Sequence, residues 1–264
     1  VPENIAWTHR QGEQGDIYFI ANQLEETRTF TASMRIHGRK PECWNPVTGE
    51  INADIPYEQK SHRTEITLTL APNESVFIVY PEEDDKETSE KERKEKKDSV
   101  KEASETGLEA TEYTVTFTAN GKTIQRQELF DWSKEEDEQI RYYSGTVVYK
   151  TTFRWKSKVK EAQQVYLNLG KVCDLATVRV NGIDCGTIWT APYRADITAA
   201  LKKGVNELEI EVTNTWANAL KGADEGKAPF DGIWTNAKYR RAENTLLPAG
   251  LLGPLNFDVA NKNK

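Results

Sequence analysis

The chain has 264 residues, a length that fits about two domains. Its hydrophobic fraction is 37% and its formal net charge is −7, so it has no basic excess. This composition excludes a nucleic-acid-binding surface. No apolar run approaches the ~18 residues of a membrane-spanning helix, and residues 1–3 open directly onto strand-like sequence without a signal peptide. The first residue is Val1 and not methionine, which indicates a processed protein or a fragment of a longer one.

Residues 1–81 are predicted to form a β-sandwich module. Apolar and polar residues alternate along 30–36 and again along 66–70, the two-residue period of a half-buried strand. Turn-forming residues at 45–49 and 71–73 separate these short segments. Closely spaced short strands without helical patterns between them are typical of a sandwich or a small barrel.

A histidine and an arginine stand together near the start of this module, in Trp7-Thr8-His9-Arg10. His9 and Arg10 are a candidate active-site edge, because the pair is suited to binding an anionic or hydroxyl group of a neighbouring site. A solvated strand edge explains the same residues, and both interpretations stay open.

A charged segment, residues 82–109, is expected to link two modules. Its residues 82–105 carry eleven acidic and seven basic side chains and no aromatic one. Such a composition buries too little apolar surface to offset the entropy of ordering it, although the Lys/Glu mixture also suits a solvated helix. We therefore expect a disordered or exposed helical linker, with a partner-binding tail as the alternative.

Residues 110–264 are predicted to form a second sandwich, a jelly roll. Alternating apolar residues mark strands at 113–117, 165–169, 176–180, 208–212 and 255–259. The Asn-Gly pairs at 120–121 and 181–182 are typical of hairpin turns. One short helix is predicted between Asp196 and Gly204: Asp196 or Thr198 would cap its start, and Gly204 would end it. The predicted fold class is thus all-β, with two antiparallel β-sandwich modules.

The three cysteines Cys43, Cys173 and Cys185 fit no metal-ligand spacing. We expect small buried thiols, with a Cys173–Cys185 disulfide in an oxidising compartment as the alternative. No cofactor and no side-chain metal site is predicted. Calcium held by backbone carbonyls leaves no sequence signature.

No complete active site is apparent in the sequence. It contains no nucleophile-elbow, phosphate-binding or zinc-helix motif. Asp224, Glu225 and Asp231 are the clustered acids in an aromatic setting, and a glycosidase needs two carboxylates held ~5–9.5 Å apart across a cleft. The other acids lie mostly in the linker or at alternating, outward strand positions, so we expect no catalytic residue.

Aromatic residues gather within about fifty residues of the second module. They are Trp189, Tyr193, Trp216, Phe230, Trp234 and Tyr239. Indole and phenol faces stack on the C–H faces of sugar rings, while Asp and Asn bind hydroxyls. Trp216 and Trp234, beside Asn218 and Asp231, are therefore the candidate carbohydrate-binding residues, with a core or lid role as the alternative. For Trp189 and Tyr193, which flank Ala191-Pro192, we favour the structural role.

Several motifs occur in a characteristic order in the second half. They are 146–153 (TVVYKTTF), 167–170 (LNLG), 176–182 (ATVRVNG), 189–198 (WTAPYRADIT) and 204–214 (GVNELEIEVTN). This series resembles the sugar-binding jelly-roll domain of family 2 glycoside hydrolases, which has the galactose-binding-like fold. The resemblance covers most of residues 110–260.

Further motifs point to a smaller group of enzymes. They are 7–10 (WTHR), 16–22 (DIYFIAN), 41–49 (PECWNPVTG) and 247–255 (LPAGLLGPL). Together they look like the C-terminal part of large bacterial enzymes similar to the α-L-rhamnosidases of glycoside hydrolase family 106. The long charged linker departs from that pattern.

The resemblance implies a periplasmic or secreted enzyme that degrades plant or host polysaccharide. In such enzymes the catalytic carboxylates lie in a (β/α)₈ barrel N-terminal to these modules, so no catalytic residue carries over to this sequence. We expect an accessory region that supports the barrel of the same polypeptide and binds glycan. The alternatives are a self-standing carbohydrate-binding or adhesive protein and an autonomous hydrolase that depends on Asp231.

Overall fold

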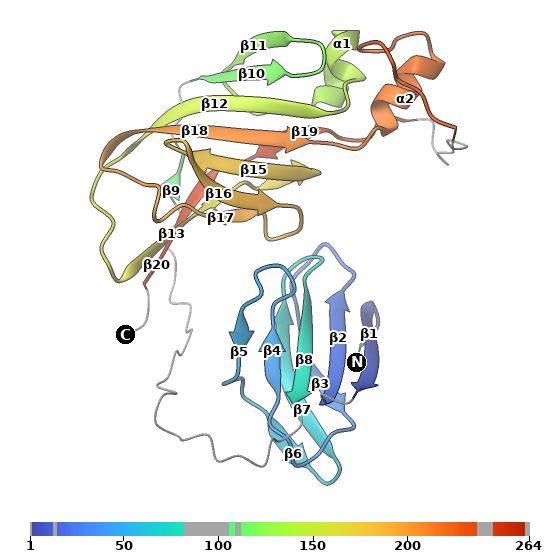
Figure 1. The fold of residues 1–264 in the computed structure, drawn as a ribbon, viewed down its shortest axis with the longest axis vertical. Helices are drawn as coiled ribbons and strands as arrows, with labels where there is room; N and C mark the ends of the chain where they lie inside the picture. Colours follow the sequence, from blue (N-terminus) through green and yellow to red (C-terminus); the bar gives the residue numbers. More distant parts are fainter. Residues whose placement is uncertain (1, 13–14, 82–105, 109–111, 237–244, 262–264) are drawn as a thin grey trace. The chain divides into compact units, whose positions relative to one another are not determined.

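A computed structural model describes residues 2–12, 15–81, 106–108, 112–236 and 245–261. These residues form two compact units, the first built from strands between residues 5 and 81 and the second from strands between residues 106 and 261 (Figure 1). All pairs of strands within the sheets are antiparallel. The predicted all-β class, with two antiparallel sandwich modules, is confirmed.

The first unit contains a five-stranded and a three-stranded sheet. The larger sheet has the order β1 (Ile5–Gly12), β2 (Gly15–Asn22), β8 (Ser75–Pro81), β4 (Glu42–Trp44) and β5 (Ile51–Asn52). The smaller sheet has the order β3 (Arg28–Met34), β7 (Arg63–Leu70) and β6 (Glu58–Lys60). Alternate residues of β3 and β7 are buried, as the sequence period predicted, and pack against inward residues of β2 and β8 to form one core.

The second unit contains two main sheets and a short ribbon. The six-stranded sheet has the order β11 (Lys122–Arg126), β10 (Tyr113–Phe117), β12 (Thr146–Trp155), β18 (Gly204–Thr213), β15 (Leu175–Val180) and β16 (Ile183–Ile188). The four-stranded sheet has the order β17 (Arg194–Asp196), β13 (Gln163–Asn168), β20 (Asn256–Asn261) and β9 (Thr106–Gly107). The ribbon pairs β14 (Lys171–Cys173) with β19 (Gly250–Gly253).

Trp132 lies at the centre of the second core, within a short 3-10 helix (Trp132–Lys134). Its side chain is fully buried, its ring edge meets the rings of Phe117 and Tyr143, and its indole N–H donates to the Tyr149 hydroxyl at 2.6 Å. Gly250 passes directly over it: a Cβ at that position would lie 2.5 Å from the indole nitrogen, and the backbone φ is +112°. The position therefore requires glycine.

The two predicted hairpins are present. Asn181 and Gly182, both at positive φ, join β15 to β16 in a two-residue turn. The second hairpin, at Asn120-Gly121, joins β10 to β11.

The helix predicted between Asp196 and Gly204 is wrong. The segment turns at residues 197–200, where the N–H groups of Ala200 and Leu201 both donate to the Ile197 carbonyl. The Asn206 side chain then binds both the N–H and the carbonyl of Lys202, so the turn is not continued into a helix. The α-helices of the described residues are α1 (Glu138–Arg141) and α2 (Ala217–Asp224).

Most of the expected linker, residues 82–105 and 109, lies outside the described residues. The described C-terminal end of this segment is not disordered or helical, as we had expected, but forms a strand. Thr106 and Gly107 form β9, because they pair with Phe257 and Asn256 of β20.

Candidate functional site

Trp216 begins α2, at the point where β18 ends and the chain leaves the six-stranded sheet. Half of its side chain is exposed, and its ring meets the edge of Phe230 at a centroid distance of 6.3 Å. Phe230 in turn contacts Tyr143 of the core at 5.8 Å. Trp216 is therefore anchored through one aromatic neighbour while it presents the rest of its indole to solvent.

Asn218 has a different role from the one its sequence position suggested. Its side chain is buried, and its amide group makes two hydrogen bonds of 2.8 Å to the backbone of Leu247, one donated and one accepted. Both the NH₂ group and the oxygen of the amide thus hold the chain segment that contains Leu247. Among the sequence-predicted carbohydrate-binding residues, it is the one whose contacts are structural.

Asp231 and Trp234 lie on the loop that follows α2, and both are exposed. Trp234 shows 76% of its surface to solvent, and Asp231 directly follows the Phe230 ring on which Trp216 packs. Within the described residues, Asp231 has no hydrogen-bond or ion-pair partner. Trp216, Asp231 and Trp234 are therefore polar and aromatic groups that remain accessible to a ligand.

The neighbouring acid Glu225 is already engaged. Its carboxylate accepts a hydrogen bond from the Tyr142 hydroxyl at 2.6 Å and forms an ion pair with Lys221 at 2.5 Å. The hydrogen bond from Lys221, followed by that from Tyr142, lowers the pKa of Glu225 below its ordinary value. Such a carboxylate stays ionised and is unsuited to act as a general acid.

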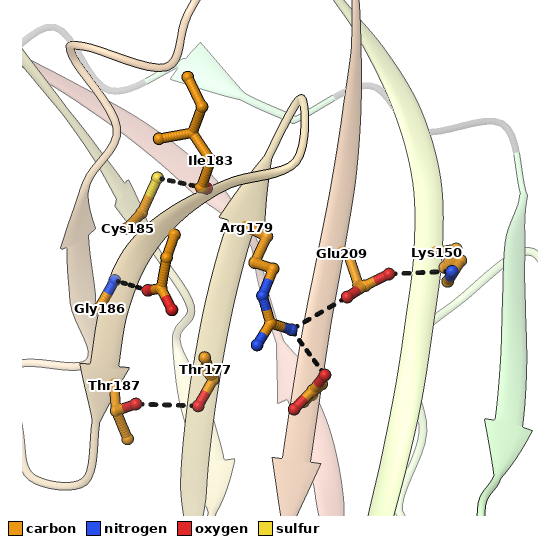
Figure 2. Close-up of polar contacts among 10 residues, drawn as sticks. Lys150, Thr177, Arg179, Ile183, Cys185, Gly186, Thr187 and Glu209 are labelled. Carbon is orange, nitrogen blue, oxygen red and sulfur yellow. Dashed lines mark hydrogen bonds and ion pairs between the residues drawn. The ribbon is translucent and has the colours of Figure 1, made fainter.

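The charged side chains Lys150, Glu209 and Arg179 lie in a row across three neighbouring strands of the six-stranded sheet, β12, β18 and β15 (Figure 2). Arg179 contacts Glu209 at 3.0 Å and Glu211 at 2.6 Å, and Lys150 contacts Glu209 at 2.9 Å from the other side. The hydrogen bond from Lys150, which outweighs the burial of the carboxyl, is the main cause that lowers the pKa of Glu209. The hollow on this face, about 490 Å³, has no aromatic lining residue. Lys150 and Arg179 both pair with Glu209, and such exposed ion pairs are typical of a solvated sheet face.

His9 lies on β1, with Tyr18 of β2 opposite it in the register. The two rings stack in parallel at 4.1 Å, and the His9 Nε2 atom lies 2.7 Å from a carboxylate oxygen of Asp16. Asp16 is buried and also forms an ion pair with Arg39. Burial alone would raise the pKa of Asp16, but hydrogen bonds from Arg39 and His9 outweigh it and lower that pKa.

Arg10 belongs to a different surface from His9. Successive side chains of a strand point to opposite faces, and only His9 contacts the Tyr18 ring and lines the adjacent groove. The structure therefore does not bring the two predicted active-site-edge residues to one site. The residues that join His9 in its groove, Arg35 and Arg63, carried no sequence signal, because 26 or more positions separate them from it.

All three cysteines are free thiols, so the alternative of a Cys173–Cys185 disulfide is wrong. Cys173 lies in β14, which pairs with β19, whereas Cys185 lies in β16, which pairs with β15. The described residues contain no group of three or more side chains able to hold a metal ion, and no helix among them has the length and apolarity to cross a membrane. Calcium bound through backbone carbonyls stays a prediction.

Comparisons with known proteins match both units. Residues 103–245 match the family described as "Glycosyl hydrolase 2 galactose-binding domain-like", and residues 1–59 match the family described as "alpha-L-rhamnosidase". The structure resembles a rhamnosidase from Novosphingobium sp. PP1Y with a TM-score of 0.72 and 35% identity over 97% of this chain. A protein of Formosa agariphila named "Putative beta-glucuronidase" is 37% identical over 175 residues, 56% of this chain.

The chain spans 24% of the rhamnosidase and 15% of the Formosa protein. The resemblance to family 2 sugar-binding domains and to α-L-rhamnosidases of family 106 is confirmed by these matches. Since the first family model covers more than half of the sequence, the chain belongs to the glycosyl hydrolase 2 galactose-binding domain-like family.

Proposed function

We propose that this chain is the accessory, non-catalytic β-sandwich region of a bacterial polysaccharide-degrading glycoside hydrolase, and that its second unit binds glycan. One observation carries the proposal: 97% of the chain aligns with a rhamnosidase of which it covers only 24%. The catalytic carboxylates, on this proposal, belong to a barrel elsewhere in the same polypeptide.

The carboxylates of the described residues support a non-catalytic role. A glycosidase needs a pair of carboxyl groups across a cleft, one of them with a raised pKa so that it can donate a proton. Asp16, Glu209 and Glu225 are instead paired with cations, and the pKa of each carboxyl lies below its ordinary value. These acids stabilise the fold and are poorly suited to proton donation.

The exposed groups around the start of α2 support glycan binding. Trp216 and Trp234 present large indole faces, on which the C–H face of a sugar ring can stack, and Asp231 is available to accept hydrogen bonds from hydroxyls. The binding set therefore consists of Trp216, Asp231 and Trp234, whereas Asn218 holds the backbone of Leu247.

The experiment is a glycan-array screen of the whole chain, followed by calorimetric titration of the best oligosaccharide. We expect Trp216→Ala and Trp234→Ala to weaken binding roughly tenfold, since one aromatic contact contributes about that much. Trp189→Ala is the matched control, because this tryptophan is also exposed and belongs to the same unit. If Trp216→Ala, Trp234→Ala and Trp189→Ala bind the oligosaccharide with equal affinity, or if the unmodified chain binds no glycan, the glycan-binding part of the proposal is contradicted.

We also propose a periplasmic or secreted location, because polysaccharides are too large to cross the cell membrane intact. Cell fractionation with an antibody against this chain tests it. Recovery of the protein in the cytoplasmic fraction contradicts this location.

A further inference from the structure

The first unit has a groove of about 380 Å³ between its two sheets. β1 is an edge strand of the five-stranded sheet and β3 is an edge strand of the three-stranded sheet, and residues of both strands line the groove. The groove therefore follows the open side of the sandwich. Its floor is apolar and consists of Tyr18, Ile20, Ala32 and Met34, which also belong to the core.

Trp7 and His9 form one wall of the groove. They share the face of β1 that begins with the buried Ile5, because alternate residues of a strand point the same way. β1 has a hydrogen-bonded neighbour on one side only, and 57% of Trp7 is exposed. His9 is fixed by its stacking on Tyr18 and by its hydrogen bond to Asp16.

Two guanidinium groups form the opposite wall. Arg63 is fixed by hydrogen bonds from its Nε atom to the Ser33 hydroxyl at 2.8 Å and from one terminal nitrogen to the Ser33 carbonyl at 2.6 Å. Its other terminal nitrogen has no hydrogen-bond partner in the part of the chain that the structure describes. The Arg35 guanidinium makes no hydrogen bond or ion pair with any described residue. Burial raises the pKa of the Tyr18 hydroxyl, a hydrogen bond from the Arg35 backbone lowers it, and the charge of Asp16 raises it further. The charges of Arg63 and Arg35 oppose this rise.

Among the residues that the structure describes, no acidic side chain lines the groove to neutralise these cations. Two carboxylates that contact lining residues are already paired, Asp16 with Arg39 and His9, and Glu65 with Lys60 at 2.5 Å. The groove therefore combines an excess of positive charge with an exposed indole and an apolar floor. Guanidinium groups bind carboxylates in a planar, two-pronged geometry, and an indole face binds the ring that carries the carboxylate.

We propose that this groove binds a carboxylate-bearing sugar, a uronate residue of an acidic glycan, with its carboxylate on Arg35 and Arg63 and its ring against Trp7. The volume is in the range of small-ligand sites. That the ligand is a sugar rests on the proposed function, whereas the site, its residues and its charge selectivity do not.

The test is a calorimetric titration of the whole chain with α-1,4-linked digalacturonate and with the neutral α-1,4-linked digalactose. We expect digalacturonate to bind at least about tenfold more tightly, and Arg35→Gln, Arg63→Gln and Trp7→Ala each to weaken it by about tenfold. Affinity should also fall as salt rises from 50 to 300 mM. Arg10→Gln is the matched control, because Arg10 is an exposed arginine of β1 outside the groove.

Equal affinity for the two disaccharides, equal loss with Arg10→Gln, or no binding of digalacturonate at 10 mM overturns the proposal. Thermal unfolding confirms that each variant is folded, and Arg35→Gln keeps the test decisive because it removes no hydrogen bond or ion pair with a described residue. Trp234→Ala separates the two proposals. Digalacturonate binding that survives this change supports the groove even where the second unit binds no glycan, whereas binding that is lost with Trp234 overturns it.

Discussion

A substitution at Asn218 tests whether this residue stabilises the fold or binds the ligand. Replacing Asn218 by alanine removes both hydrogen bonds to the Leu247 backbone and leaves a small cavity at a side chain that is 1% exposed. Each such hydrogen bond contributes about 0.5–1.5 kcal/mol net. Leu247 is 38% exposed, so water can reach part of its backbone, and we expect a total loss of about 2 kcal/mol.

The assay is differential scanning calorimetry of the second unit. For a domain of this size, a loss of about 2 kcal/mol lowers the Tm by roughly 4–8 °C. Asn218→Asp should also destabilise, because a carboxylate cannot donate to the Leu247 carbonyl. Trp234→Ala, at a 76% exposed position, serves as the control and should leave the Tm unchanged. An Asn218→Ala variant with unchanged Tm and abolished glycan binding would refute the structural role and make Asn218 a ligand-binding residue.

Three further predictions follow from particular contacts. Gly250→Ala should destabilise the second unit by about 2–4 kcal/mol in urea, because its Cβ meets Trp132 at 2.5 Å, whereas Gly226→Ala, with open space around it, should cost only about 1 kcal/mol. Because the folded-state pKa of Asp16 lies below its ordinary 3.8, its contribution is present above about pH 4 and is lost as the pH falls through the folded-state pKa. Asp16→Asn should therefore lower the free energy of unfolding of the first unit at pH 7 by about 1–3 kcal/mol, given the partial exposure of Arg39, and change it little at pH 2.5. Equal losses of unfolding free energy at pH 7 and pH 2.5 would contradict this. Ellman's reagent in denaturant should titrate three thiols, and one thiol alone would show a disulfide.

The strands were readable from the sequence because each sandwich has one buried and one solvated face per sheet. Alternation along β3, β7 and β15 follows directly from that environment. The turn at Asn181-Gly182 was equally readable, since few residue pairs adopt two successive positive φ values.

The helices were not readable in the same way. The segment 196–204 has helix-like ends, but the Asn206 side chain binds both the N–H and the carbonyl of Lys202 and closes a turn instead. α2 begins at Trp216 without a side-chain cap and contains Gly222, both contrary to helix signals. Gly222 is needed there because a Cβ would lie 2.8 Å from Tyr142, a contact that only the tertiary structure shows.

The candidate sites were predictable only in part. Exposed tryptophans at 216 and 234 agree with a ligand-facing role, but local sequence could not show that the Asn218 amide reaches Leu247, 29 positions away. Likewise, the strand order that brings Arg35 and Arg63 to the groove beside His9 depends on pairings between distant segments.

The most direct test of the accessory role is the hydrolysis of aryl glycosides by this chain alone. The purified chain at high concentration is incubated with 4-nitrophenyl α-L-rhamnoside and 4-nitrophenyl β-D-glucuronide, with Asp231→Asn in parallel. A non-catalytic region predicts that neither protein releases nitrophenol faster than buffer. Turnover by the unmodified chain that Asp231→Asn abolishes would contradict the account and make the chain an autonomous hydrolase.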